Sequence, residues 1–288
     1  MASPVAADRT LQVSTGYYQQ FDADLSAEVP GEGYGGWQTA ELPLSLDHTA
    51  VVVMHAWDCG SPEDHPGWFR AVEYLPRSYE IARTVLPPLL AAARGAGLPV
   101  VHVVAGRDYW SHLPGALGDG TADPAPDRIP TDPVHRELAT FRTHKVFPGD
   151  HNRADIDRGR PTVDFLPAAR PVGDEAIAAT STDLIAHCRA QGINHLLYTG
   201  FAIDACLQTS PGGMVDMSRA GVMCSAVRQA TTAVEHAETA RDQLAKQIGL
   251  IKVAVHYGFV YDADALITAL SSEQDVGGLT HLIDQVDP

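Results

Sequence analysis

Cys206 is the residue whose position in the sequence best suits covalent chemistry. It follows NHLLYTG (194–200), an apolar segment typical of a buried strand that ends at Gly200. The next segment, 201–221, is predicted as a helix with a glycine-rich interruption, so Cys206 lies near its start. Free amides at a helix start stabilise a thiolate and can bind an oxyanion. Cys206 is therefore a candidate nucleophile; the alternative is an inert, buried cysteine.

The other cysteines and the common catalytic motifs give weaker signals. Cys188 falls within a predicted helix, Cys224 within a predicted strand and Cys59 after the first strand, positions that favour packing. There is no CxxC pair, so neither a zinc ribbon nor a disulfide framework is indicated. There is also no GxSxG motif and no P-loop, which removes the main signals of serine hydrolases and NTPases.

The segments that must position Cys206 alternate between strand and helix. Apolar, β-branched runs predict buried strands at 49–55, 98–106, 194–200 and 222–227, and IKVAVHYG (251–258) predicts a fifth strand or strand-like piece. Helices are predicted at about 76–94, 174–191, 233–247 and 262–271, in addition to 201–221. This order predicts a three-layer α/β/α fold with a central, mostly parallel sheet. Ligands of such sheets bind at the carboxyl ends of the strands, which here follow residues 55, 105, 200 and 227.

Two segments depart from this alternation. Residues 1–46 are rich in turn formers around one strand-like piece, LQVSTGYY, and predict an N-terminal arm, folded as a hairpin, that packs on a main domain at 47–288. Residues 107–172 hold many Pro, Gly, Asp and His and show little periodicity. A loop of that length in a compact domain is usually a functional segment, a lid or an assembly surface.

Charge limits the partners. The chain has 288 residues, with 36 acidic and 20 basic side chains, and a formal charge of −16. This excess argues against a nucleic-acid or anionic-membrane partner, since phosphates need clustered Lys and Arg. Apolar runs such as AVVVM (50–54) are too short to span a bilayer, and MASPVAADRT lacks the features of a secretory signal. We expect a cytoplasmic protein that acts on a small molecule.

The segment GFAIDAC (200–206) resembles the nucleophile segment of the isochorismatase-like cysteine hydrolases, commonly written G-[VF]-A-T-D-x-C. The order of elements from about 49 to 272 is also similar to that family. In that family a thiolate attacks the carbonyl carbon of an amide or a related compound. The resemblance implies that Cys206 is the nucleophile, that the Phe201–Ala202 peptide bond is cis, and that the amides of Ala202 and Cys206 form an oxyanion hole.

The general base departs from the family pattern. The family's first strand ends in an aspartate, and aligning AVVVMHAWD with it puts His55 in that place. An imidazole can accept a thiol proton and later protonate the leaving group. Asp58 is an alternative carboxylate, and a hydrogen-bonded core histidine is the structural alternative for His55. Trp57 and Phe201 would offer a flat substrate an apolar, π-rich wall.

The family also has a lysine that polarises the substrate. Of the three lysines, Lys246 and Lys252 follow Cys206, which leaves Lys145 in THKVFPGDHN. Arg170, in FLPAARPVG, lies nearer to the expected spacing and could supply a fixed positive charge, but it cannot shuttle protons. We favour Lys145 and keep Arg170 as the alternative; Lys145 could also be a solvated loop residue.

A metal site is the less favoured use of the histidines. Side chains that could converge near the strand ends are His55, His65, His102, Asp108 and His112. Some relatives bind a metal through D-x-H-x-x-x-H, but Trp110 stands where the first His of that pattern would be. We therefore predict neither a metal nor another cofactor.

The resemblance implies a hydrolase that cleaves a C–N bond of a small amide, carbamoyl or ureido compound through an acyl-enzyme. It also implies a homodimer or homotetramer, with 107–172 as a candidate for subunit contacts. Two alternatives stay open. The site could have decayed to leave a ligand-binding or assembly protein, because fold does not determine function. Alternatively, His55 and Asp58 could perform acid–base chemistry without Cys206.

Overall fold

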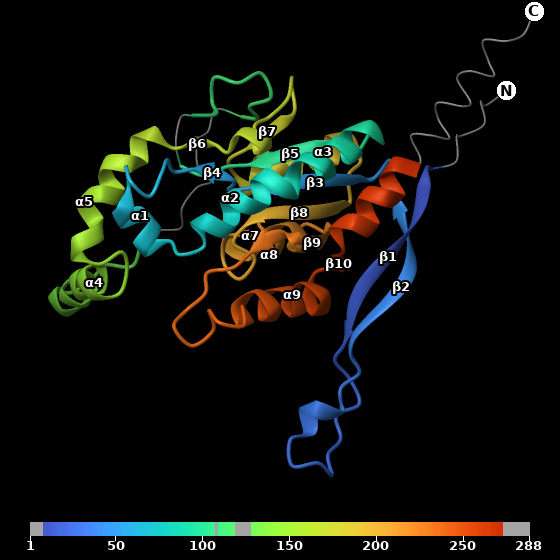
Figure 1. Cartoon of the computed structure of the whole chain (residues 1–288), viewed down its shortest axis with the longest axis horizontal. Helices are drawn as coiled ribbons and strands as arrows, with labels where there is room; N and C mark the ends of the chain where they lie inside the picture. The colour runs from blue at the N-terminus through green and yellow to red at the C-terminus, as the bar shows by residue number, and fades with distance from the viewer. Residues whose placement is uncertain (1–7, 107–108, 119–127, 273–288) are drawn as a thin grey trace, which may run out of the picture.

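A central eight-stranded sheet organises the chain, and the computed structural model describes residues 8–106, 109–118 and 128–272 (Figure 1). The strands of this sheet are β1 (Thr10–Gln19), β2 (Gly36–Ser45), β3 (Thr49–Met54), β5 (Val100–Val103), β7 (Ala176–Ala178), β8 (His195–Phe201), β9 (Met223–Thr232) and β10 (Val260–Tyr261). Their order is β2-β1-β10-β9-β8-β3-β5-β7. The six strands from β10 to β7 are parallel, and the β1–β2 hairpin joins β10 in antiparallel fashion.

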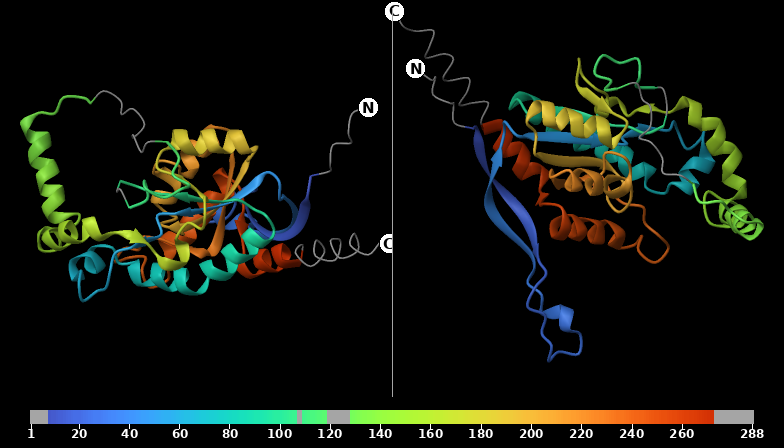
Figure 2. Two further views of the ribbon diagram at one scale, coloured as in Figure 1. Left: turned by 90° about the horizontal axis from the view of Figure 1, so that it is seen from above. Right: turned by 180° about the vertical axis from the view of Figure 1, so that it is seen from behind.

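Helices cover both faces of the sheet (Figure 2). They are α1 (Pro66–Ala71), α2 (Leu75–Thr84), α3 (Leu86–Gly95), α4 (Pro133–Lys145), α5 (Asp150–Gly159), α6 (Ser181–Gln191), α7 (Cys206–Thr209), α8 (Met214–Arg219), α9 (Leu244–His256) and a helix at 263–272. Short 3-10 turns occur at η1 (Pro30–Gly33), η2 (Arg160–Thr162) and η3 (Pro167–Ala169), and β4 (Trp57–Asp58) pairs with β6 (Asp164–Phe165). The predicted three-layer α/β/α fold is confirmed. None of the helices in the described ranges is long and apolar enough to cross a bilayer.

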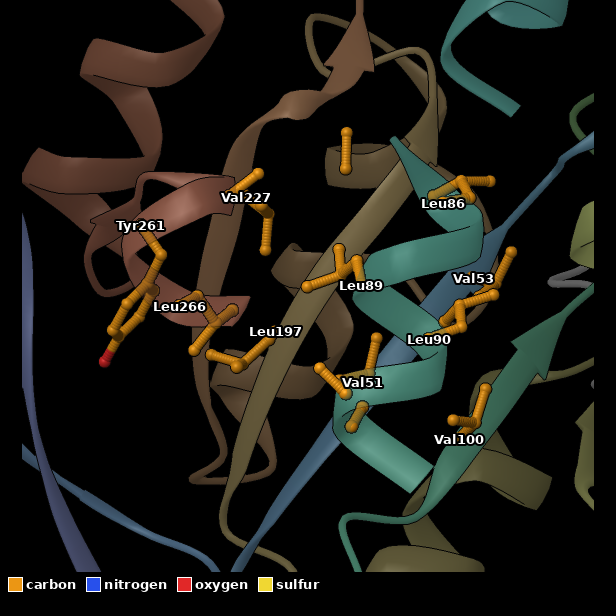
Figure 3. Close-up of a cluster of buried hydrophobic side chains, with 14 of the residues drawn as sticks. Val51, Val53, Leu86, Leu89, Leu90, Val100, Leu197, Val227, Tyr261 and Leu266 are labelled. Atoms are coloured by element: carbon orange, nitrogen blue, oxygen red, sulfur yellow. The ribbon is translucent and has the colours of Figure 1, made fainter. Parts of the chain in front are cut away.

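The apolar run of β3 is buried on both sides because alternate residues of a strand point to opposite faces. Val51 and Val53 pack with Leu86, Leu89 and Leu90 of α3 in one buried cluster (Figure 3). The β3 residues between them belong to a second cluster, which α6, α8 and α9 cover. The two clusters hold the strand ends, and therefore the residues that follow them, in place.

The helix predicted at 76–94 is present as α2 and α3, separated at Val85. The predicted helix with a glycine-rich interruption is present as α7 and α8, and the predicted helix at 262–271 is present at 263–272.

The prediction for 233–258 is wrong. Residues 251–256 of IKVAVHYG form the second half of α9 rather than a strand, no helix spans 233–243, and the parallel strand that follows β9 along the chain is β10. Gly249, Leu250 and Val253 form the buried stripe of α9, a helical spacing. A short apolar run does not by itself distinguish a buried strand from a buried helix.

Two further predictions need correction. The segment 174–191 begins with the strand β7, and only α6 is helical. Alanine favours helix, so Ala176 and Ala178 made this segment resemble a helix in sequence. Pairing with β5 stabilises it as a strand. The long segment 107–172 is also not a plain loop, because it contains α4 and α5.

The N-terminal hairpin is a continuous extension of the sheet. Its register runs from Thr10 opposite Ser45 to Gln19 opposite Gly36. Only Thr15 and Gly16 of β1 pair with β10, so the far half of the hairpin leaves the sheet and projects from the body (Figure 1).

Candidate active site

The carboxyl ends of β3 and β8 lie side by side. Met54 pairs with Gly200, and a Cβ atom at Gly200 would lie 1.9 Å from the Met54 carbonyl oxygen. Gly200 has a φ of +105°, a region that favours glycine. This close approach puts His55 and Phe201, which follow the paired residues directly, at the same edge of the sheet.

Cys206 is the first residue of α7 and is half-buried. The other three cysteines are buried. Burial raises the pKa of the Cys59 and Cys224 thiols to about 12 and that of Cys188 to about 11. These three thiols are therefore poor nucleophiles near neutral pH, and Cys206 is the most accessible of the four.

The turn that carries Cys206 leaves two amides available. The Ala202 carbonyl accepts hydrogen bonds from the amides of Leu207 (3.0 Å) and Ala205 (3.2 Å). Among the described residues, the amides of Ala202 and Cys206 themselves have no hydrogen-bond acceptor. The Phe201–Ala202 peptide bond is cis, as the resemblance implied. The turn that carries the thiol therefore holds two N–H donors without an acceptor in the described part of the chain, which an oxyanion hole requires.

Tyr74 and Asp204 also lie around this turn, and the sequence analysis named neither of them as a residue of the site. Burial raises the pKa of Tyr74, and the neighbouring Cys206 thiolate raises it further. The Tyr74 ring lies 6.4 Å from that of Phe201. Asp204 accepts a hydrogen bond from the Val234 amide at 2.9 Å, which ties the turn to the end of β9. Asp204 belongs to the GFAIDAC segment, but no pattern in the sequence pointed to Tyr74.

His55 is buried beside the strand ends, with 5% of its surface exposed. Neither ring nitrogen has a hydrogen-bond partner within the described part of the chain, which excludes there a hydrogen-bonded core histidine. Burial lowers the pKa of His55 to about 4, so the imidazole is neutral at neutral pH. Its φ of +52° is uncommon for a residue other than glycine, and such strain often marks a functional site.

Trp57 connects His55 with a cavity of about 300 Å³. The His55 and Trp57 rings are stacked, with their centroids 4.8 Å apart. The other walls of the cavity include Trp68, Ala105, Ile156, Val163 and Arg160. Phe201 is buried in the core cluster instead, so Trp57 contributes to this cavity without the second predicted wall residue.

Asp58 is engaged in local structure. Its Oδ1 atom accepts hydrogen bonds from the Tyr79 hydroxyl (2.8 Å) and from the Gly60 amide (2.9 Å). These bonds hold the turn after β4, so an acid–base role for Asp58 would have to compete with them.

The two candidate cations lie in different places. Lys145 is the last residue of α4, with a side chain 63% exposed, and its ammonium lies 3.9 Å from the Asp150 carboxylate. Arg170 forms an ion pair with Asp164 and lies 5.8 Å from the centre of the Phe165 ring. Phe165 pairs with Trp57 in the β4–β6 sheet. Arg170 is therefore linked through Phe165 to the tryptophan that lines the cavity.

The candidate metal ligands are not brought together among the described residues, where no group of three His, Cys, Asp or Glu side chains could hold a metal ion. His102 contacts Glu175 at 3.0 Å, and His65 lies 4.0 Å from Asp155. Asp108 lies outside the described residues.

No family model and no curated protein matches the chain. Among solved structures it is similar to a cysteine hydrolase from Pseudomonas syringae pv. phaseolicola 1448A, at 18% identity and a TM-score of 0.46, over 81% of this chain and 97% of that one. It is also similar to an isochorismatase-like hydrolase from Alkaliphilus metalliredigens, at 14% identity and a TM-score of 0.42, over 77% and 98% of the two chains.

A third similar structure is the MAR1 ribonuclease from Caenorhabditis elegans, at 11% identity and a TM-score of 0.40, over 85% of this chain and 94% of that one. Some of these similar structures are thus of proteins from the family whose nucleophile segment GFAIDAC resembles. Identities below 20% and TM-scores below 0.5 carry no information about the reaction, which has to be derived from the site itself.

Proposed function

We propose that the protein is a cysteine hydrolase that cleaves a C–N bond of a small amide, carbamoyl or ureido compound. The observation that carries this proposal is the half-buried Cys206 thiol on the same short turn as the Ala202 and Cys206 amides, which lack acceptors among the described residues. A nucleophile next to two unengaged N–H donors is the arrangement that acyl transfer requires.

In the proposed reaction, His55 accepts the thiol proton of Cys206 and the thiolate attacks the substrate carbonyl carbon. The Ala202 and Cys206 amides stabilise the oxyanion of the tetrahedral intermediate. The C–N bond then breaks, and the His55 imidazolium donates its proton to the leaving nitrogen. A water molecule, deprotonated by His55, hydrolyses the thioester and releases the acid and the free thiol.

The site also suggests the shape of the substrate. The cavity beside Trp57 has mainly apolar walls and accommodates a compact apolar or flat group. Lys145 or Arg170 would supply the positive charge that polarises the carbonyl group. Arg170 is connected to Trp57 through Phe165, whereas Lys145 lies on the exposed helix α4.

Mass spectrometry of trapped adducts tests this function. The protein is incubated with a panel of small amides and ureides, quenched in acid and digested, and the Cys206 peptide is searched for an acyl adduct. We expect the adduct on Cys206 and no turnover by Cys206→Ala. Turnover that survives Cys206→Ala and is lost in His55→Ala would instead establish acid–base chemistry without the thiol. Absence of both adduct and turnover across the panel would favour a ligand-binding protein.

A further inference from the structure

The helix α4 is uncovered along its whole length. None of its thirteen residues is buried. Val134, Leu138 and Phe141 share one face, at spacings of four and three residues, and each is 59–62% exposed. An isolated helix of this length is marginal in water and usually depends on packing of its apolar face. The exposed apolar face of α4 therefore indicates a partner.

A hollow lies beside this face and shares Leu138 with it. It has a volume of about 610 Å³, and its lining includes Leu138, Arg142, Val146 and Phe147. Phe147 also lines the cavity beside Trp57, so the hollow adjoins the wall of the candidate active site. A segment that binds here needs apolar side chains and negative charge.

The tip of the β1–β2 hairpin has these properties. We define the tip as residues 20–35, which connect the two strands and project from the body (Figure 1). Phe21, Leu25 and Val29 of the tip are all exposed, Leu25 to 88%. A two-stranded hairpin is at best marginally stable by itself in water. Among the described residues nothing covers these three side chains, so we infer that the tip also packs on a partner.

The charges of the two surfaces are complementary. The tip contains four acidic residues and no Lys or Arg; the acidic residues are Asp22, Asp24, Glu28 and Glu32. Helix α4 contains Arg136, Arg142 and Lys145 against the single acidic residue Glu137. A basic helix is unusual in a chain with a formal charge of −16. Complementary charges steer and align an interface, and apolar contacts stabilise it.

We propose that the hairpin tip of one copy of this chain docks along α4 of a second copy. Figure 1 and the right-hand view of Figure 2 show the tip and α4 projecting from separate parts of one molecule, so a tip does not cover its own α4. If two copies exchange their tips about a twofold axis, each tip and each α4 is covered, and the assembly is closed as a dimer. This interface does not depend on the chemistry proposed for Cys206.

Charge reversal followed by charge restoration tests the contact. Sedimentation velocity over a concentration series gives the dimer dissociation constant of the full-length protein, of Glu28→Lys, of Arg142→Glu and of the double variant. We expect each single reversal to raise the dissociation constant about tenfold or more, and the double variant to recover most of that loss. Glu41→Lys and Arg189→Glu are matched controls at exposed positions outside the tip and α4. They should leave the dimer dissociation constant unchanged.

Three outcomes would overturn the proposal. The first is a monomer at all concentrations. The second is a dimer that neither single reversal weakens. The third is a dimer that Arg142→Glu weakens and Glu28→Lys does not, which would assign another occupant to α4. Circular dichroism of each variant checks that its fold is intact, and Leu25→Ser, which removes an apolar contact without changing charge, should weaken the dimer as a second test of the tip.

Discussion

The imidazole of His55 stacks on the indole of Trp57, with the ring planes 19° apart. This contact gives Trp57 two roles, since one part of its side chain covers the candidate base and another lines the cavity. It also helps to exclude water from His55, whose pKa burial lowers to about 4. The acid–base properties of the candidate site are therefore coupled to the shape of the cavity beside Trp57.

Alkylation should distinguish Cys206 from the other thiols. We expect iodoacetamide to modify Cys206 at least about tenfold faster than Cys59, Cys188 or Cys224, because burial raises the pKa of those three thiols and their thiolate fraction is small. Peptide mapping by mass spectrometry over time gives the four rates. Cys188→Ser should leave the fast rate unchanged. Equally slow modification of all four cysteines would count against a reactive Cys206.

The pH dependence of activity should report the low pKa of His55. A general base must be deprotonated, so activity is retained down to the pKa of the base. We expect the acidic limb of kcat/KM to fall near pH 4 rather than near 6.5. A pH profile with the substrate found in the adduct screen measures it. A limb near 6.5 would mean that His55 is not the base or is not buried in the working enzyme.

The stability of the fold should also depend on His55. Its pKa is lowered from 6.5 to about 4 on folding, so the unfolded chain binds more protons between these pH values. The free energy of unfolding should therefore fall as pH decreases from 6.5 to 4, and His55 should contribute up to about 1.4 kcal/mol per pH unit.

Urea unfolding at a series of pH values measures this slope. His195 has the same shift from burial and remains in the variant His55→Gln, which should show a shallower slope than the parent. Identical slopes for parent and variant would contradict the burial of a neutral His55.

Neutral substitutions should identify the cation. If Arg170 polarises the substrate, Arg170→Met should lower kcat by about 100-fold, the scale of losing one charge-stabilising group, while Lys145→Met changes it little. The opposite pattern would assign the role to Lys145. Steady-state kinetics of the two variants decide between them, and Arg189→Met is a control at another exposed arginine. Unchanged kinetics in both variants would exclude both residues.

Replacing Gly200 should disrupt the meeting of β3 and β8. Gly200→Ala puts a Cβ atom into the Met54 carbonyl oxygen, so we expect a loss above about 3 kcal/mol in the free energy of unfolding. Gly221 is the matched control, because it has a φ of +87° and a Cβ atom added there would meet nothing within 4 Å. Gly221→Ala should cost only about 1–2 kcal/mol. Equal losses in thermal or urea unfolding would contradict the close approach at Gly200.

The sequence by itself determined the layered fold and the position of the thiol. Buried parallel strands such as β3 are readable because their apolar, β-branched runs are local and continuous. Cys206 is readable because a glycine-ended strand and the start of a helix flank it within a few residues. The sequence did not distinguish α9 from a strand or reveal β7, since in both segments burial and pairing with distant strands decide the conformation.

Only the tertiary structure decided the environments of the site residues. The low pKa of His55 results from burial beside Trp57 and from the absence of hydrogen-bond partners in the described part of the chain. The position of Lys145 depends on how residues 128–172 fold into helices, of which α4 projects from the body and stays exposed. The pKa of a group depends on its burial and on the charges around it, and both are set by residues far apart in the chain. Local sequence patterns therefore carry little information about it.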